Sequence, residues 1–435
     1  MKKPLNKKIL ILAGGSLFIF LFAGIIRMNP AVPLLLIILY ISFYNTFSRT
    51  KGATLTNLSF LFLISFTTGH VLLKHNLPFY FIPIAIIPML SALLFSNLSI
   101  AYFLSLATSL SLASCCSEPF KALAAFTAAC ACATLLVNKA HKRTTVIQAG
   151  LASGLVQLIV ILLFEHFWIN QPQRYLVILL NSLLSGVVVL GVLPIFEYLL
   201  ETVTNISLLE LADSHHPLLQ RMVLEAPGTY HHSLIVGNLS DTACTAIGAN
   251  GLLARVGAYY HDIGKLQKPE YFIENQQIKK NLHDELSPTM SKLIIMNHIK
   301  EGLELAKKYS LSPVLWDFIQ QHHGNSLVYY FYRRALEGRE EDEEVTEEGF
   351  RYPGPKPNTK EAAVVLLADS VEAATRTLKE PGPAKIEEAV HKIINNKFID
   401  GQLDECELTL KDIEQISSVF TKILSGIYHS RVNYS

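Results

Sequence analysis

The segment that decides the fold of the second half of the chain runs from Asn250 to Lys265 and reads NGLLARVGAYYHDIGK. The spacing of apolar residues from Asn250 to Ala258 predicts the start of a helix. Signals for strands are scarce from residue 213 onward, where the pattern is helical. We therefore predict an all-α domain built around the polar pair His261 and Asp262.

Further side chains of the metal-binding types recur in this helical half. They are His231, His232, His298, His322, His323 and Asp369. A single His within an apolar helix is usually a core residue whose hydrogen bonds are satisfied. Here two His-His pairs, one His-Asp pair, a further His and an apolar-flanked Asp need a common explanation. A metal site supplies one.

The types of side chain indicate the chemistry. Imidazole and carboxylate without thiolate favour Mn, Fe or a similar borderline-hard ion over a closed structural zinc site. Neighbours on a helix point about 100° apart, so His261 and Asp262 cannot chelate one ion together. The two oxygens of an Asp can instead bridge two ions, and ions about 3.5–4 Å apart can deprotonate a water and neutralise a phosphodiester. The pattern predicts metal-assisted hydrolysis.

These residues and their surroundings resemble a known family. The set His232, His261, Asp262 and Asp369 is similar to the H…HD…D signature of HD-superfamily metal phosphohydrolases. The segments 226–233, 252–265 and 350–357 resemble the bacterial 7TM-HD membrane receptors that hydrolyse cyclic di-AMP. A His-Asp pair alone is a weak signal, whereas the full set is specific and extends over the whole soluble half and the multi-span half.

The resemblance implies two divalent ions, Mn or Fe, and a bridging hydroxide as the nucleophile. One ion is expected on His232, His261, Asp262 and Asp369, and the other on Asp262, His298, His322 and His323. Asp262 and Lys265 are the residues expected to act in catalysis. His231 is not a ligand in the family pattern, and whether it supports a neighbouring ligand stays open.

The expected reaction is the opening of cyclic di-AMP to the linear dinucleotide pApA. Lys265 shares a helix face with His261 and either meets a phosphate oxygen or is solvated. Arg351, Tyr352 and Lys356 either contact phosphate and adenine or hold their own proline-rich loop. Glu372 and Arg376 are expected to pair along their helix, which begins at a predicted capping box over 358–361 and runs over 362–378.

Other functions stay open within this chemistry. An HD hydrolase could act on a guanosine polyphosphate or on cyclic di-GMP, although the Gly-Tyr-Pro motif of the related HD-GYP branch is absent after Asp262. A receptor that binds a nucleotide without turnover is the alternative from another class. It is disfavoured because a pure binder needs no site for an activated water.

Charge divides the chain near Leu200. Up to that residue there are thirteen Lys and Arg but three Asp and Glu, whereas the remainder carries 24 and 33. Apolar runs near the length of about 20 residues that a transmembrane helix needs recur in the first part. They cover residues 9–26, 30–47, 55–73, 77–95, 98–116, 119–137, 145–167 and 175–200. We predict eight transmembrane helices, of which the short, proline-containing second is the weakest.

The loops give the orientation. With the N-terminus inside, inside loops carry nine Lys and Arg and outside loops carry four. This bias predicts a multi-pass protein of the bacterial inner membrane with both termini in the cytoplasm. Two alternatives stay open: an interfacial second segment would move the C-terminal half across the membrane, and the first run resembles the core of a signal peptide.

The predicted organisation is a transmembrane bundle over 1–200, a connecting helix over 201–225 and an HD phosphohydrolase domain over 226–435. Family members usually carry an extracellular domain after the first span, whereas here three residues, 27–29, separate the first two runs. Sensing by such a domain is therefore expected to be absent. The expected partners are a cyclic dinucleotide and the lipid bilayer; a homo-oligomer stays open. The acidic second half argues against a nucleic-acid polymer.

Overall fold

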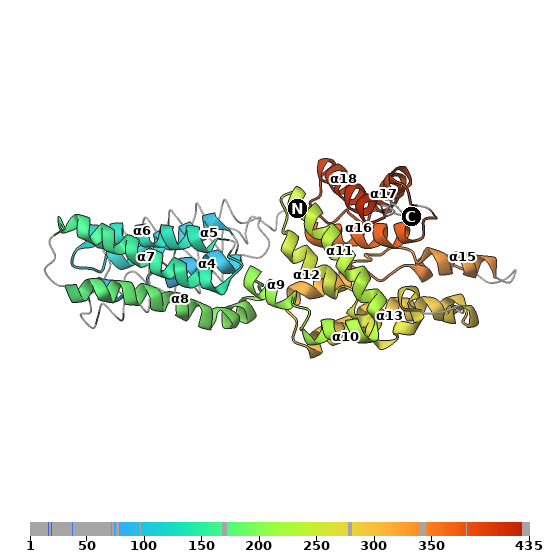
Figure 1. Cartoon of the computed structure of the whole chain (residues 1–435), viewed down its shortest axis with the longest axis horizontal. Coiled ribbons are helices and arrows are strands. Elements are labelled where there is room, and N and C mark those ends of the chain that lie inside the picture. The colour runs from blue at the N-terminus through green and yellow to red at the C-terminus, as the bar shows by residue number, and fades with distance from the viewer. Residues whose placement is uncertain are drawn as a thin grey trace, which may run out of the picture. The chain divides into compact units, whose positions relative to one another are not determined.

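The fold is described from a computed structural model. It describes residues 78–95, 97–138, 140–167, 172–276, 281–338, 345–379 and 381–428, with a few single positions before residue 78. Within these ranges the chain is helical and has no strand, only an isolated antiparallel bridge between Leu327 and Arg351. The predicted all-α class is confirmed. The chain forms two compact units, Met1–Ile206 and Ser207–Ser435 (Figure 1).

The described helices of the first unit are strongly apolar. They are η1 (Phe79–Phe81), α4 (Ile86–Phe95), α5 (Leu98–Ala113), α6 (Pro119–Val137), α7 (Arg143–Phe164) and α8 (Pro172–Leu200). Of these, α6, α7 and α8 are long and apolar enough to cross a membrane, whereas α5 is shorter. The segment predicted as a span over 77–95 is divided in the described residues into η1 and α4, with Pro83, which has no N–H to donate, between them.

Three predicted spans, 9–26, 30–47 and 55–73, lie outside the described residues. The same holds for residues 27–29, which separate the first two predicted spans. The count of eight spans and the orientation of the termini therefore stay predictions.

Small residues let α7 and α8 approach closely. A Cβ added at Gly150 would lie 2.6 Å from the Ser182 carbonyl oxygen, and one at Gly186 would lie 3.0 Å from the Val146 carbonyl oxygen. Only glycine fits such backbone contacts, which are a common way of packing helices within membranes. Helix α7 packs against α8 on one side and against α6 on the other (Figure 1).

The connecting helix predicted over 201–225 is interrupted. After α8 ends at Leu200, Glu201 adopts a left-handed backbone conformation with φ 51°, and Thr202 donates its N–H to the Glu197 carbonyl at 3.0 Å. The chain then forms two short helices, α9 (Asn205–Leu211) and α10 (Pro217–Glu225). Apolar spacing alone did not reveal this break, because the apolar periodicity continues through it.

The second unit is a helical domain that surrounds the segment from which the prediction began. Its longer helices are α11 (Pro227–Ala246), α12 (Gly251–Tyr260), α13 (Pro288–Lys308), α14 (Pro313–Gln321), α15 (Tyr329–Glu337), α16 (Lys360–Arg376), α17 (Pro383–Ile399) and α18 (Leu410–Ile427). Short 3-10 turns η2 (Ile263–Gln267), η3 (Pro269–Tyr271), η4 (Ile273–Asn275), η5 (Leu282–Glu285) and η6 (Glu348–Phe350) connect them.

Helix α16 is the centre of this unit. Every residue from Ala362 to Asp369 is buried, which is the pattern of a helix covered on all sides. Helices α11, α12, α14, α17 and α18 pack around it. An ionisable residue on such a helix needs partners inside the protein, and Asp369 is that residue.

The start of α16 differs from the predicted capping box. Thr359 is the N-cap, and its hydroxyl accepts from the Ala362 N–H at 3.2 Å. Glu361 instead accepts from the Asn250 N–H at 2.8 Å, so its carboxylate ties the start of α12 to the start of α16. The helix accordingly begins two residues before the predicted Ala362.

Candidate metal centre

The His-Asp pair lies where one kind of helix changes into another. Helix α12 ends at Tyr260, His261 keeps right-handed helical angles, and Asp262 turns to φ −108° and ψ 13° before η2 begins. Both residues are buried, with 0% of the surface of His261 and 1% of that of Asp262 exposed to solvent. Because the chain changes here from an α-helix to a 3-10 helix, the side chain of Asp262 points in a different direction from the one it would have if the α-helix continued.

One group of candidate ligands combines His232, His261 and Asp369 from three different helical segments. Their ligand atoms lie within 4.8 Å of one another, and all three residues are buried. Asp369 Oδ1 is 3.0 Å from His232 Nε2 and 3.9 Å from His261 Nε2. These contacts give Asp369 the partners that its position on α16 requires.

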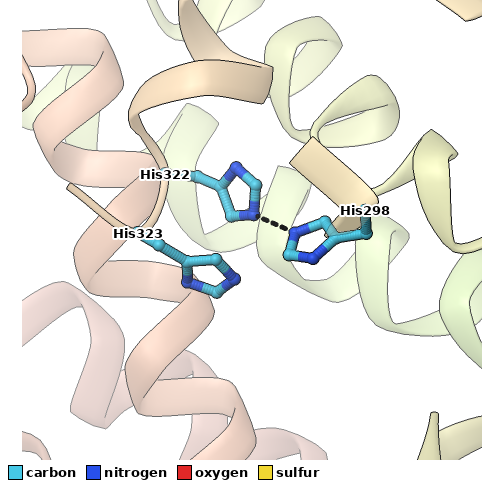
Figure 2. Close-up of side chains that lie close together, drawn as sticks. All are labelled: His298, His322 and His323. Carbon is cyan, nitrogen blue, oxygen red and sulfur yellow. Dashed lines mark hydrogen bonds between the residues drawn. The ribbon is translucent and has the colours of Figure 1, made fainter. Parts of the chain in front are cut away.

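A second group combines His298 of α13 with His322 and His323, which directly follow α14 (Figure 2). His298 Nε2 and His322 Nε2 lie 3.1 Å apart. Their Nδ1 atoms lie 2.5 Å from the Ile295 carbonyl oxygen and 3.0 Å from the Phe318 carbonyl oxygen. A neutral ring that donates from Nδ1 has no hydrogen on Nε2. The contact dashed in Figure 2 is then an approach of two lone pairs, which a cation would resolve.

Asp262 faces both groups, one oxygen to each. Its Oδ2 lies 3.2 Å from His261 Nε2 and 3.7 Å from His232 Nε2. Its Oδ1 lies 3.5 Å from His298 Nε2 and 3.6 Å from His322 Nε2. This is the arrangement that a carboxylate needs to bridge two metal ions.

Several buried side-chain atoms in the described part of the chain lack hydrogen-bond partners. Within the cluster, His261 Nε2 and Asp262 Oδ1 are the two of these that also lack an ion pair with a lysine or arginine. An unsatisfied buried polar atom is costly unless something else binds it. Both atoms face the histidine and carboxylate cluster, so the residues fit a metal ion of the kind that binds imidazole and carboxylate.

Hydrogen bonds orient the ligand rings from outside the cluster. His261 Nδ1 lies 2.6 Å from the Ala258 carbonyl oxygen, and His232 Nδ1 lies 2.5 Å from Glu372 Oε2. With Nδ1 engaged, Nε2 is the atom left to face the centre. Such outer partners fix the tautomer and orientation of metal-bound histidines.

The protonation of the cluster follows from these contacts. Burial alone would lower the pKa of His232, but its hydrogen bonds to Asp369 and Glu372 raise that pKa to about 9. Burial and the neighbouring His261 lower the pKa of His322 to about 3. Burial would raise the pKa of Asp369, yet its hydrogen bond from His232 and the nearby histidines hold that pKa well below its usual range. The carboxylate is therefore charged, and His322 is neutral and able to bind a cation.

Lys265 is not solvated, so that alternative is wrong. Only 13% of its side chain is exposed, and its Nζ lies 2.7 Å from Asp262 Oδ2 and 2.8 Å from Glu274 Oε1. Burial would lower the pKa of Lys265, but Asp262 and Glu274 raise it. Lys265 therefore stays charged beside the cluster, held by two carboxylates.

The loop residues expected at the substrate have partners of their own. Arg351 pairs with Glu347 at 2.5 Å and with Asp400 at 2.8 Å. Lys356 Nζ lies 3.3 Å from Asp404 Oδ2. These two contacts agree with the alternative in which basic residues hold the loop.

Tyr352 is the member of this loop that reaches the centre. It is buried, and its ring stacks on His323 with centroids 4.3 Å apart and an interplanar angle of 24°. The predicted contact of its ring with a base is not tested by this arrangement. Its contact with a candidate metal ligand is an addition to the prediction.

Two glutamates of the site were not predicted for it. Glu372 pairs with Arg376 at 2.5 Å, as expected for residues four apart on a helix, but it also hydrogen-bonds to His232. Glu274 binds Lys265 from a turn that the sequence does not distinguish from an ordinary loop. His231 is exposed, and the residue that contacts the Nδ1 atom of the candidate ligand His232 is Glu372.

Two parts of the chain match known protein families. Residues 20–204 match the family described as 7TM receptor with intracellular HD hydrolase, and residues 229–374 match the HD domain. The chain belongs to the 7TM receptors with an intracellular HD hydrolase. The family resemblance in the sequence is thereby confirmed. Its membership and the three long apolar helices make this 7TM-HD chain a membrane protein.

Named relatives are similar over most of the chain. Cyclic-di-AMP phosphodiesterase PgpH of Bacillus subtilis is 44% identical over 69% of this chain and 43% of its own length. Cyclic-di-AMP phosphodiesterase PgpH of Listeria monocytogenes is 36% identical over 92% of this chain and 53% of its own length. This 7TM-HD chain therefore spans about half the length of the curated relatives it matches.

A crystal structure of the L. monocytogenes PgpH HD domain in complex with cyclic-di-AMP is also similar. It is 47% identical, covers 50% of this 7TM-HD chain and 100% of its own, and has a TM-score of 0.47.

Proposed function

We propose that this chain is a membrane-anchored, metal-dependent phosphodiesterase that hydrolyses cyclic di-AMP to pApA and so lowers the level of this second messenger. The observation that carries the reaction class is Asp262, whose two buried oxygens face two separate histidine groups. The substrate is supported by the printed names of two relatives, at 44% and 36% identity.

We further propose two divalent ions, Mn or Fe, as the cofactors. The first would be held by His232, His261, Asp262 and Asp369, and the second by Asp262, His298, His322 and His323. When bound, such a pair supplies an activated water and neutralises charge on the phosphodiester. The contact between His298 Nε2 and His322 Nε2 supports a bound cation, and the lack of thiolate in the ligand set favours these ions over a structural zinc.

The chain's own residues would orient and balance this centre. Asp262 belongs to both proposed ligand sets. Lys265 Nζ, 2.7 Å from Asp262 Oδ2, would balance part of the negative charge of this carboxylate. Glu372 holds the His232 ring through Nδ1 at 2.5 Å. Tyr352 covers one face of His323, which limits the rotation of that ring. We assign Asp262 and Lys265 to catalysis, and Arg351, Tyr352 and Lys356 to the walls of the substrate site.

We propose the same division of labour along the chain as the sequence predicts. Residues 1–200 would anchor the enzyme in the bacterial inner membrane, 201–225 would connect the parts, and 226–435 would form the HD domain on the cytoplasmic side. The cyclic dinucleotide and the lipid bilayer are its proposed partners.

The test uses the full chain purified in detergent and loaded with Mn or Fe. Cyclic di-AMP, cyclic di-GMP and a guanosine polyphosphate are offered separately, and the products are resolved by chromatography. We expect conversion of cyclic di-AMP to pApA in preference to the others. Metal analysis of the same sample should give close to two ions per chain.

Adjacent histidines provide a matched pair of variants. His232→Ala removes a buried candidate ligand, whereas His231→Ala removes its exposed neighbour on the same helix. We expect the first to abolish turnover and the second to leave it near wild type. An absence of cyclic di-AMP turnover, or equal activity of the two variants, would refute the proposed function.

A further inference from the structure

Lys397 is a lysine near the candidate metal centre that the sequence did not single out. It lies on α17, is partly exposed, and its Nζ donates to Ser326 Oγ at 2.7 Å. Ser326 belongs to the turn after the second histidine pair: its N–H donates to the His323 carbonyl at 3.1 Å. The Ser326 carbonyl in turn accepts the Tyr352 N–H at 3.0 Å. The ammonium group therefore lies beside the wall formed by His323 and Tyr352.

Lys397 differs from the other cations of this region in its charge balance. Lys265 pairs with Asp262 and Glu274, Arg351 with Glu347 and Asp400, Lys356 with Asp404, and Arg376 with Glu372. Lys397 has a hydroxyl as its hydrogen-bond partner, and in the described part of the chain no ion pair joins it to a carboxylate.

The surroundings of Lys397 favour an additional anion. Burial lowers the pKa of Lys397, Arg351 lowers it further, and Asp369 and Asp400 raise it in part. Asp400 is itself engaged by Arg351 at 2.8 Å, and Asp369 is a proposed metal ligand. The negative charge that balances Lys397 is thus shared with other cations. Lys397 is therefore a partly buried cation without a dedicated counter-ion, and such perturbed charged groups are candidates for a functional role.

We propose that Lys397 is a substrate-binding residue that holds a phosphate group of the nucleotide beside the metal centre. The proposal rests on the proposed function for the identity of the nucleotide. An ammonium group is a compact charge with three donors, so it can keep its bond to Ser326 while it binds a phosphate oxygen. It would act mainly on binding, because among the described residues its hydrogen bond goes to Ser326 and not to a proposed metal ligand.

The experiment compares three variants in the full, metal-loaded chain. Lys397→Met removes the charge, Lys397→Arg keeps it, and Lys392→Met removes an exposed lysine from the same helix. For cyclic di-AMP we expect kcat/KM of Lys397→Met to fall by about 10- to 100-fold, mainly through a higher KM. Lys397→Arg should retain most of the activity, and Lys392→Met all of it. Metal content should be unchanged in each.

A second measurement separates this proposal from the proposed function. Binding of inorganic phosphate to each metal-loaded protein is followed by calorimetry, which needs no turnover. We expect weaker phosphate binding in Lys397→Met even if cyclic di-AMP is not the substrate. Lys397→Gln, which removes the charge but keeps a donor for Ser326, repeats the comparison if the Met variant fails to fold. Phosphate affinity and KM equal to those of Lys392→Met would overturn the proposal.

Discussion

Gly264 is the position at which the geometry of the centre is most sensitive to a single methyl group. A Cβ built there would lie 1.8 Å from the His298 carbonyl oxygen and 2.5 Å from the Gly302 N atom, whereas real Cβ atoms almost never come closer than 3.0 Å. In Gly264→Ala, η2 and α13 must therefore separate by at least about 1.2 Å. Both obstacles are backbone atoms, so no side chain can rotate away to relieve the contact.

This separation acts directly on the proposed second ion. Asp262 lies two residues before Gly264, and its Oδ1 is 3.5 Å from Nε2 of His298, the residue that the new methyl group would push away. Metal–ligand distances tolerate about 0.2 Å, and a displacement near 1 Å can cost about 100-fold in rate. We expect Gly264→Ala to lose about one of two ions and at least about 100-fold in kcat/KM.

The assay is metal analysis together with turnover of cyclic di-AMP by the full chain. Gly426→Ala is the control, because a Cβ there meets no atom within 4 Å and alanine favours a helix. We expect this control to match wild type in both measurements. If Gly264→Ala binds two ions and turns over at the wild-type rate, the link between this glycine contact and the metal geometry is wrong.

Three further predictions follow from the contacts around the ligands. Glu372→Gln removes the charge at His232 Nδ1 and should weaken metal binding by about 10- to 100-fold in a titration, whereas exposed Glu388→Gln should not. Tyr352→Phe keeps the ring stacked on His323 and should keep activity, whereas Tyr352→Ala should lower it by about 2- to 10-fold. Removal of metal by a chelator should lower the thermal midpoint of the second unit by about 5–10 °C, relative to protein in free metal at 100-fold its dissociation constant, and added Mn should restore it.

The candidate ligands could be singled out from the sequence because their types are unusual in apolar helices. His298 and Asp369 are buried polar residues that local packing does not require, and a shared metal site explains them together. The choice between His231 and His232 is different. Adjacent positions on a helix point about 100° apart, so one faces inward, but either assignment fits the sequence until α16 is known to pack on α11. The family resemblance favours His232, which is the buried residue of the two.

The partners of the charged residues could not be predicted in the same way. Lys265 meets Glu274 across a 3-10 turn, and Arg351 meets Asp400, which is 49 positions away along the chain. No local pattern encodes such pairs, since each depends on how separate helices meet. The same limit explains why the break after Leu200 was not predicted. The spacing of apolar residues shows which face of a helix is buried, and that spacing continues through Glu201 although its backbone is left-handed.

The backbone at Asp262 explains how two adjacent residues can contribute to two different ligand groups. On a continued α-helix, Asp262 would point about 100° away from His261 and could not share its ion. At φ −108° and ψ 13°, the chain instead tightens into η2, and Asp262 Oδ2 comes within 3.2 Å of His261 Nε2 while Oδ1 faces α13. The 3-10 turn then brings Gly264 against the His298 carbonyl, which holds α13 at the distance that Oδ1 requires. The glycine that permits the close approach and the aspartate that faces both groups are therefore parts of one local structure, which explains why an Asp-x-Gly spacing accompanies the His-Asp pair in this chain.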